Sequence, residues 1–161
     1  PESELDLLDF LGQGAYGAVR KARRRSNGQM VAVKMIPVEA CSSAVSDLKK
    51  EIDMMSLLRS PYVVALHRCY LRTTEAWIVM DYCGGGSVDD IMVIRSSSQN
   101  PLSEVEVKCC AAWMVMGLQH LHEQHMMHRD LKAGNVLLTT DGKAKLADFG
   151  VSAIMQVCSS I

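Results

Sequence analysis

The sequence predicts an α+β protein made of two bodies, a β-rich first half and a helical second half. Runs rich in β-branched or apolar residues at 7–11 and 30–36 favour strands early in the chain. Apolar residues at three- and four-residue steps over 104–121 predict a long helix later. Three consecutive glycines at 84–86 are typical of a flexible connector. We therefore expect the boundary between two lobes at these glycines.

Composition is that of an ordinary globular protein. Of the 161 residues, 48% are hydrophobic and 22% are charged, and the formal net charge is −1. This near-neutral charge argues against nucleic acid or a membrane surface as a partner. No apolar run reaches membrane-spanning length, and no charged-then-apolar leader opens the chain. The six cysteines include no CxxC pair, so we expect a reducing, cytoplasmic location.

Three glycines near the start, Gly12, Gly14 and Gly17, form a GxGxxG pattern. Such glycines let backbone amides approach phosphate groups without obstruction by a Cβ atom. Dinucleotide-binding domains share the pattern, but in those domains it opens a helix. Here a strand and a hairpin turn signal at 26–29 follow, which predicts a glycine loop followed by a strand, a turn and a second strand. The basic cluster at 21–25 flanks that turn, and we interpret it as a solvated patch rather than a docking site.

A single lysine, Lys34, stands in the middle of the second strand run. A charge in a strand fit for burial is costly unless it is paired, although a lysine on the solvent face of an edge strand is the plainer alternative. The helix predicted at 45–58 carries Glu51 beside its apolar stripe. Glu51 is therefore the candidate partner of Lys34, with Glu39 and Asp47 as competitors.

Further elements follow from turn and cap signals. Strands are predicted at 63–66 and 76–80, a helix at 88–95, and a polar loop at 96–101. Ser103 and Glu106 form a capping box that opens the long helix. The apolar residues expected to form a buried stripe on this helix are Val107, Ala111, Met114, Leu118 and Leu121. Short strands at 136–138 and 145–146 are expected around a turn at 141–142, which would bring Asn135 close to Asp148.

The chemistry is concentrated in residues 128–135, which read His-Arg-Asp-Leu-Lys-Ala-Gly-Asn. Phosphoryl transfer from a magnesium nucleotide needs a carboxylate that orients a hydroxyl and accepts its proton, and a cation for the moving phosphoryl group. Asp130 and Lys132 supply these two groups. The transfer also needs oxygen ligands for the metal, and Asn135 and Asp148 supply them.

This spacing resembles the catalytic-loop and metal-loop signature of eukaryotic protein kinases. A lysine two residues after the catalytic acid resembles the serine/threonine type. Four further strings look like the sterile-twenty-like kinases, close to the mammalian-sterile-like branch. They lie at 60–64, 77–83, 132–135 and 146–153.

The resemblance implies a two-lobed kinase fold that binds ATP and Mg²⁺, with protein substrates as partners. Lys34 would hold the phosphates and Glu51 would orient Lys34. Asp130 would accept the proton and Lys132 would steady the γ-phosphoryl group. The other nucleotide-binding residues that it implies lie in the glycine loop, the neighbouring strands and the connector: Leu11, Gly12, Gln13, Gly14, Ala15, Tyr16, Gly17, Val19, Ala32, Met80, Asp81, Cys83, Ser87 and Leu137.

The resemblance gives residues 7–83 as the first lobe and the start of the hinge, and 84–161 as an incomplete second lobe. The whole chain, 1–161, thus resembles a partial kinase domain, because residues 156–161 do not look like the activation loop of the family. We expect its helical apolar stripe to be partly exposed, which would favour homo-association. Two functions remain open: a serine/threonine kinase, or a catalytically inert fragment that binds nucleotide or a partner.

Overall fold

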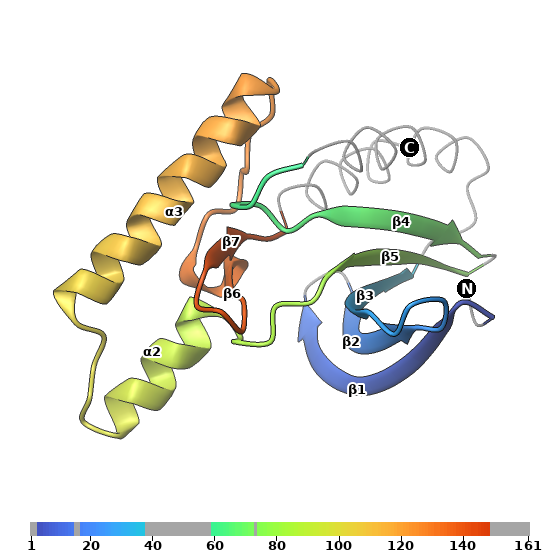
Figure 1. The fold of residues 1–161 in the computed structure, drawn as a ribbon, viewed down its shortest axis with the longest axis horizontal. Coiled ribbons are helices and arrows are strands. Elements are labelled where there is room, and N and C mark those ends of the chain that lie inside the picture. The colour runs from blue at the N-terminus through green and yellow to red at the C-terminus, as the bar shows by residue number, and fades with distance from the viewer. Residues whose placement is uncertain (1–2, 15–16, 38–58, 73, 149–161) are drawn as a thin grey trace. The chain divides into compact units, whose positions relative to one another are not determined.

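A computed structural model describes residues 3–14, 17–37, 59–72 and 74–148 (Figure 1). The chain divides into two compact units, and each is described by itself. The described part of the first unit is 3–14, 17–37, 65–72 and 74–82, and that of the second is 59–64 and 83–148. The helix predicted at 45–58, which carries Glu51, lies outside the described residues, as do Ala15 and Tyr16.

The first unit is a five-stranded antiparallel sheet with the order β1-β2-β3-β5-β4 (Figure 1). Its strands are β1 (Leu5–Gly14), β2 (Gly17–Arg24), β3 (Met30–Pro37), β4 (Leu66–Leu71) and β5 (Glu75–Asp81). β1 and β2 form a glycine-rich hairpin, in which Gly14 lies opposite Gly17. Gly28 adopts a φ of 72° in the predicted turn between β2 and β3. The hairpin excludes the dinucleotide-binding alternative, in which a helix would follow the glycines.

One face of this sheet forms the core of the first unit. Its buried residues are Leu5, Ala22, Val31, Val33, Trp77 and Val79. They come from β1, β2, β3 and β5, so a single apolar cluster holds four of the five strands together. Burial of apolar surface is the main favourable contribution to folding.

The strand predicted at 63–66 is misplaced. β4 begins at Leu66, whereas Val63 and Val64 belong to the second unit. Val63 forms a parallel bridge with Leu146, and the Val64 N–H donates to the Leu146 carbonyl at 2.8 Å. Both valines are buried. The apolar run therefore reflects burial against Leu146 rather than a place in the five-stranded sheet.

The second unit contains two helices, a 3₁₀ turn and a two-stranded sheet (Figure 1). These are α2 (Val88–Ser97), α3 (Glu104–Glu123), η1 (Ala133–Asn135), β6 (Val136–Leu138) and β7 (Ala144–Leu146). The Ser103 capping box and both short strands are confirmed, and α2 extends two residues beyond its predicted end. No helix in the described ranges is both long enough and apolar enough to cross a membrane.

The buried stripe predicted along α3 is wrong for the first half of the helix. Leu121 is fully buried, but Val107 and Ala111 are exposed. α3 packs on β7 through its second half, where a Cβ atom placed on Gly117 would stand 2.9 Å from the Tyr62 carbonyl oxygen. The apolar periodicity predicts a face that favours burial, and only part of that face is covered. Its exposed half agrees with the expectation of a partly exposed stripe.

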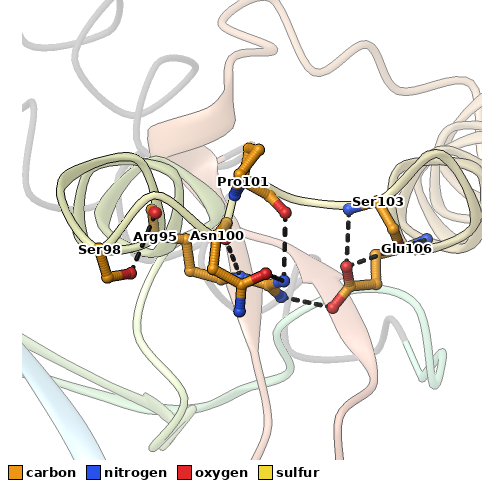
Figure 2. A network of polar contacts seen from close by, with 6 residues as sticks. All are labelled: Arg95, Ser98, Asn100, Pro101, Ser103 and Glu106. Carbon is orange, nitrogen blue, oxygen red and sulfur yellow. Dashed lines mark hydrogen bonds and ion pairs between the residues drawn. The ribbon is translucent and has the colours of Figure 1, made fainter.

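A single arginine ties α2 to α3 (Figure 2). The Arg95 Nε donates to the Asn100 carbonyl at 2.8 Å, and another guanidinium nitrogen donates to the Pro101 carbonyl at 3.2 Å. A third guanidinium nitrogen donates to the Glu106 carboxylate. Glu106 also accepts from the backbone N–H and the hydroxyl of Ser103, each at 2.7 Å. Arg95 thus fixes the loop between the helices to the cap of α3.

This network predicts acid sensitivity of the second unit. Hydrogen bonds from Ser103, and then from Arg95, lower the pKa of Glu106 from 4.5 to about 2. Because the folded pKa lies below the unfolded one, the carboxylate stabilises the fold above pH 4.5, and that stabilisation is lost as the pH falls towards 2. The urea midpoint, followed by circular dichroism, should therefore fall more steeply over this window in the wild type than in Glu106→Gln. Glu104→Gln removes a carboxylate from the same helical turn without touching the cap, and it should keep the wild-type slope.

Candidate active site

The strand register gathers four predicted nucleotide-binding residues on one face of the first unit's sheet. Val19 lies opposite Lys34, and Ala32 lies opposite Met80. Since side chains alternate along a strand, Ala32 and Lys34 share a face of β3. Val31 and Val33 of the core point to the other face. The sheet thus separates these four residues from the apolar core.

Lys34 lies at the centre of that face. β3 lies between β2 and β5, and the Lys34 side chain is only 2% exposed. The alternative of a lysine on the solvent face of an edge strand is therefore wrong. A buried ammonium group needs an opposite charge or hydrogen bonds to offset its lost hydration. Glu51, Glu39 and Asp47 lie outside the described residues, so the pairing of Lys34 with Glu51 remains a prediction.

The glycine hairpin lies close to β3. Gly12 is opposite Val19 and Gln13 is opposite Ala18, next to the Gly14–Gly17 pair. Gly17 has a φ of 144°, and a Cβ atom there would stand 2.0 Å from the Met35 carbonyl oxygen. Only glycine fits such an approach. Leu11, at a register shift of β1, is 45% exposed.

Asp81, at the end of β5, makes a clamp that the sequence did not predict. Its N–H donates to the Ala65 carbonyl at 3.0 Å, and its carboxylate accepts from the Ala65 N–H at 3.2 Å. The same carboxylate lies 2.9 Å from the His67 Nε2. His67 lies at a register shift between Leu66 and Arg68, and no sequence pattern marks that shift. The clamp fixes the backbone of the first predicted hinge residue.

The glycine connector was predicted to be flexible, but two of its glycines are hydrogen-bonded within the second unit. The Gly85 N–H donates to the Leu138 carbonyl, and the Leu138 N–H donates to the Gly86 carbonyl, both at 2.8 Å. A Cβ atom on Gly85 would stand 2.8 Å from the Leu138 carbonyl oxygen. These glycines therefore permit close contact with β6. The next residue, Ser87, forms a bridge with Leu137, so two predicted nucleotide-binding residues lie side by side.

Ser87 also has a structural role. Its hydroxyl donates to the Asp90 carboxylate at 2.6 Å and accepts from the Asp90 N–H at 3.0 Å, which caps α2. The hydrogen bonds that the Ser87 hydroxyl and the Ser87 backbone N–H donate to the Asp90 carboxylate hold the pKa of Asp90 below its usual value. The hydroxyl is thus engaged in the capping box, and the backbone of Ser87 is the part that pairs with β6.

Three predicted catalytic and metal-binding residues meet at one carboxylate in the second unit. Asp130 Oδ2 accepts from Lys132 Nζ at 2.7 Å and from Asn135 Nδ2 at 2.9 Å. Asn135 Nδ2 also donates to the Asp130 backbone carbonyl at 2.8 Å. η1 makes this possible, because its turn is closed by the Asn135 N–H, which donates to the Lys132 carbonyl at 2.9 Å. A short local turn thus organises the segment around Asp130.

The same contacts keep Asp130 ionised. The hydrogen bond from Lys132, together with that from Asn135, lowers the pKa of Asp130, although its partial burial works in the opposite direction. The side chain is 46% exposed. An ionised carboxylate that solvent can reach is able to accept a hydrogen bond, and then a proton, from a hydroxyl group.

Left-handed backbone occurs on both sides of this segment. Arg129 has a φ of 65° and Asp148 a φ of 61°. Residues other than glycine rarely adopt such values, and the strain they carry clusters at functional sites. The Ala147 N–H donates to the Asn135 carbonyl at 2.8 Å, so the backbone that leads into Asp148 is hydrogen-bonded to Asn135. The residue before Asp148 is thus in direct contact with Asn135, which agrees with the expectation that the two predicted metal ligands lie close together.

The donor chemistry of these two residues fits Mg²⁺. The Asn135 amide nitrogen is directed to Asp130, which leaves the carbonyl arm of the amide for another partner. Asp148 supplies a carboxylate. Mg²⁺ prefers oxygen ligands and is usually bound by one or two protein groups together with water and substrate phosphates. Asn135 and Asp148 would be its protein ligands here.

His128 is buried in the second unit. It is 3% exposed, and burial is the main cause that lowers its pKa. Its Nδ1 accepts from the Asp130 N–H at 3.4 Å, and its Nε2 has no hydrogen-bond partner in the described part of the chain. Burial therefore favours the neutral form of the ring.

Comparison with known protein families agrees with these features. The model of the protein kinase domain family matches residues 5–160, nearly the whole chain. The match includes the glycine hairpin, Lys34 and the Asp130 segment. Protein kinase domains in general use ATP and Mg²⁺ for phosphoryl transfer. This chain belongs to the protein kinase domain family.

Proposed function

We propose that this chain is a serine/threonine protein kinase domain that transfers the γ-phosphoryl group of Mg-ATP to hydroxyl groups of protein substrates. The observation that carries the proposal is the Asp130 carboxylate held by Lys132 and Asn135. The position of Lys132 supports the serine/threonine type, because it resembles that type of kinase. The strings at 77–83 and 146–153 support a sterile-twenty-like relative.

In this proposal, the second unit provides the chemistry. Asp130 orients the substrate hydroxyl and accepts its proton as the oxygen attacks the γ-phosphorus. Lys132, whose Nζ lies 2.7 Å from the Asp130 carboxylate, steadies the charge of the moving phosphoryl group. Asn135 and Asp148 hold Mg²⁺, which when bound neutralises charge on the phosphates.

The first unit provides most of the nucleotide-binding groups. Lys34 binds the α- and β-phosphates and is oriented by Glu51. The backbone amides of the glycine hairpin, residues 12–17, cover the phosphates. Backbone groups of Asp81 and Cys83 hold the adenine ring, and Met80 is the gatekeeper beside it. The apolar side chains that sandwich the ring are Leu11, Val19, Ala32 and Leu137. Ser87 is a further nucleotide-binding residue.

A second candidate function rests on exposed apolar residues of α3. Val105 is 69% exposed and Val107 is also exposed in its first half, and Val115 is exposed on the uncovered side of its second half. An apolar patch of this kind marks an interaction surface or favours association. A catalytically inert form, which binds nucleotide or a partner through this patch, is therefore the alternative. Homo-association belongs to the same alternative, and a cytoplasmic location is proposed for either.

A phosphotransfer assay separates the two candidates. The chain is incubated with γ-labelled Mg-ATP and a generic basic protein, and the labelled product is hydrolysed to identify the phosphoamino acid. We expect phosphoserine and phosphothreonine in the wild type and no label with Lys34→Met. Lys143→Met removes an exposed lysine of the β6–β7 turn and should keep the wild-type rate. ATP binding without label transfer would support the inert form, and phosphotyrosine as the product would contradict the serine/threonine assignment.

A further inference from the structure

The first unit has a cavity of about 480 Å³ at the ends of β1, β2 and β4. Its lining includes Leu5 and Val79, which belong to the apolar core. Val79 neighbours Ile78, the β5 residue opposite Lys34, so these side chains point to opposite faces of the sheet. The cavity therefore lies on the opposite face from the candidate active-site residues of this unit.

Three arginines line the cavity, and they come from different parts of the unit. Arg24 ends β2, Arg25 begins the following turn, and Arg68 lies on β4. The hydroxyl-bearing side chains of Tyr70 and Ser26 are also part of the lining. The sequence predicted a solvated patch at 21–25. Arg23 and Arg25 of that cluster are exposed, and Arg24 and Arg25 also line this cavity. Tertiary structure has added Arg68 from a strand more than 40 positions away.

The charges of the lining are unbalanced. Three arginines face one acidic residue among the described lining residues, Glu4, which leaves two excess positive charges. Glu4 is engaged, since its carboxylate accepts from Arg68 at 3.0 Å and from the Tyr70 hydroxyl at 2.8 Å. Arg25 binds Asp6, which is not part of the lining, at 2.8 Å, so one of these two excess charges is balanced from outside the cavity.

Arg24 is the residue that these acids do not explain. Its Nε is buried and has no hydrogen-bond partner in the described part of the chain. A buried polar group without a partner is uncommon in folded proteins, and an unassigned ligand is one explanation for it. Because Arg24 carries a positive charge in the cavity wall, such a ligand would be a negatively charged hydrogen-bond acceptor.

We propose that this cavity binds a phosphate monoester, with Arg24 and Arg68 as its principal ligands. The planar guanidinium group donates two parallel hydrogen bonds to a phosphate, which makes arginine well suited to this anion. The cavity of about 480 Å³ leaves room beside the phosphate for the carbon part of the ester. Without ligand, the Glu4 carboxylate accepts hydrogen bonds from the Arg68 guanidinium and the Tyr70 hydroxyl, so it competes with the phosphate for these two groups. A bound phosphate displaces Glu4 from both.

Titration followed by ¹⁵N–¹H NMR tests this proposal with three probes: inorganic phosphate, phenyl phosphate and a short phosphoserine peptide. We expect saturable shifts of the Arg24, Arg68 and Tyr70 amides, with tighter binding of the esters than of inorganic phosphate. Tighter binding of the peptide than of phenyl phosphate assigns the site to phosphoproteins, and the reverse order assigns it to small esters. Equal binding of all three probes, or shifts centred on residues 12–19, would overturn the proposal.

Variants of the charged residues, some expected to weaken phosphate binding and one expected to tighten it, complete the test. Arg24→Gln and Arg68→Gln should each weaken phenyl phosphate binding by about tenfold or more, since each removes a charge-assisted hydrogen bond. Arg23→Gln is the matched control, because Arg23 binds Asp6 at 3.2 Å and does not line the cavity. It should change the affinity by less than about twofold, since exposed charges are largely screened. An equal loss of affinity for phenyl phosphate in Arg23→Gln would show that the binding is non-specific electrostatic attraction, and it would overturn the proposal.

Glu4→Gln should tighten phenyl phosphate binding several-fold, because it removes the competing carboxylate while Arg68 and Tyr70 remain. This gain of affinity keeps the proposal falsifiable even if Arg24→Gln fails to fold. Unchanged or weaker binding in Glu4→Gln would overturn the proposal that the phosphate takes the place of the Glu4 carboxylate on Arg68 and Tyr70.

Discussion

Asp130→Asn is expected to lower kcat for phosphoryl transfer by about 10²–10⁴-fold, the usual contribution of a general base. Asparagine keeps the size of the side chain and its ability to accept a hydrogen bond from Lys132. It cannot accept the proton of the attacking hydroxyl. Because the lost interaction matters only during the transfer, KM for ATP should change little while kcat and kcat/KM fall together. Steady-state kinetics with a generic basic protein measure both constants.

The β6–β7 turn offers a matched control for this substitution. Asp141 is also an exposed aspartate that pairs with a lysine two residues later, at 2.7 Å from Lys143 Nζ. Its hydrogen bonds lower its pKa to about 2. Asp141→Asn should therefore leave kcat unchanged. A similar fall of kcat in both variants would indicate a general charge effect and would contradict the assignment of Asp130.

The features that the sequence predicted well are set by neighbouring residues. The Ser103 capping box depends on two side chains within one helical turn. The turn between β2 and β3 depends on Gly28, whose φ of 72° favours glycine. The closeness of Asn135 to the residues before Asp148 depends on the short β6–β7 hairpin, where the Ala147 N–H donates to the Asn135 carbonyl. Local rules were sufficient for each of these features.

The features that the sequence missed depend on contacts between distant residues. Val63 and Val64 are as apolar as strand residues, but what they pack against is decided by Leu146, more than 80 positions away. Val107 fits the helical stripe, yet it is exposed because α3 packs on β7 only through its second half. An apolar pattern states that a residue favours burial and does not state which surface buries it.

The same distinction holds within the candidate site. The sequence singled out Asp81 and the glycines at 84–86, but not the clamp of Asp81 on His67 or the hydrogen bonds of Gly85 with β6. Arg24 and Arg68 line one cavity only because β2 and β4 belong to the same sheet. The chemical role of a residue could be predicted from the sequence, whereas its contacts with distant residues could be identified only from the folded structure.

Trp77→Ala is expected to destabilise the first unit by about 3–5 kcal/mol, the usual cost of removing a buried large aromatic side chain. Trp77 is 3% exposed and packs in the apolar core. It lies on β5 opposite Met35, one position from the pair formed by Ile78 and Lys34. Since small domains are stable by only about 5–15 kcal/mol, this loss should also weaken ATP binding through Lys34.

Trp77→Phe separates the loss of packing from the loss of the indole. The Trp77 Nε1 is buried and has no partner among the described residues. Phenylalanine removes this unsatisfied donor and still fills most of the space, so we expect a cost of no more than about 1–2 kcal/mol. The chain has two tryptophans, and the other, Trp113, packs on Tyr62 in the second unit with 5.1 Å between ring centroids. In both variants urea unfolding followed by Trp113 fluorescence therefore reports the second unit, while circular dichroism reports the whole chain. Equal destabilisation by Trp77→Ala and Trp77→Phe would contradict the packing role of Trp77, because only the alanine variant leaves a large cavity in the core.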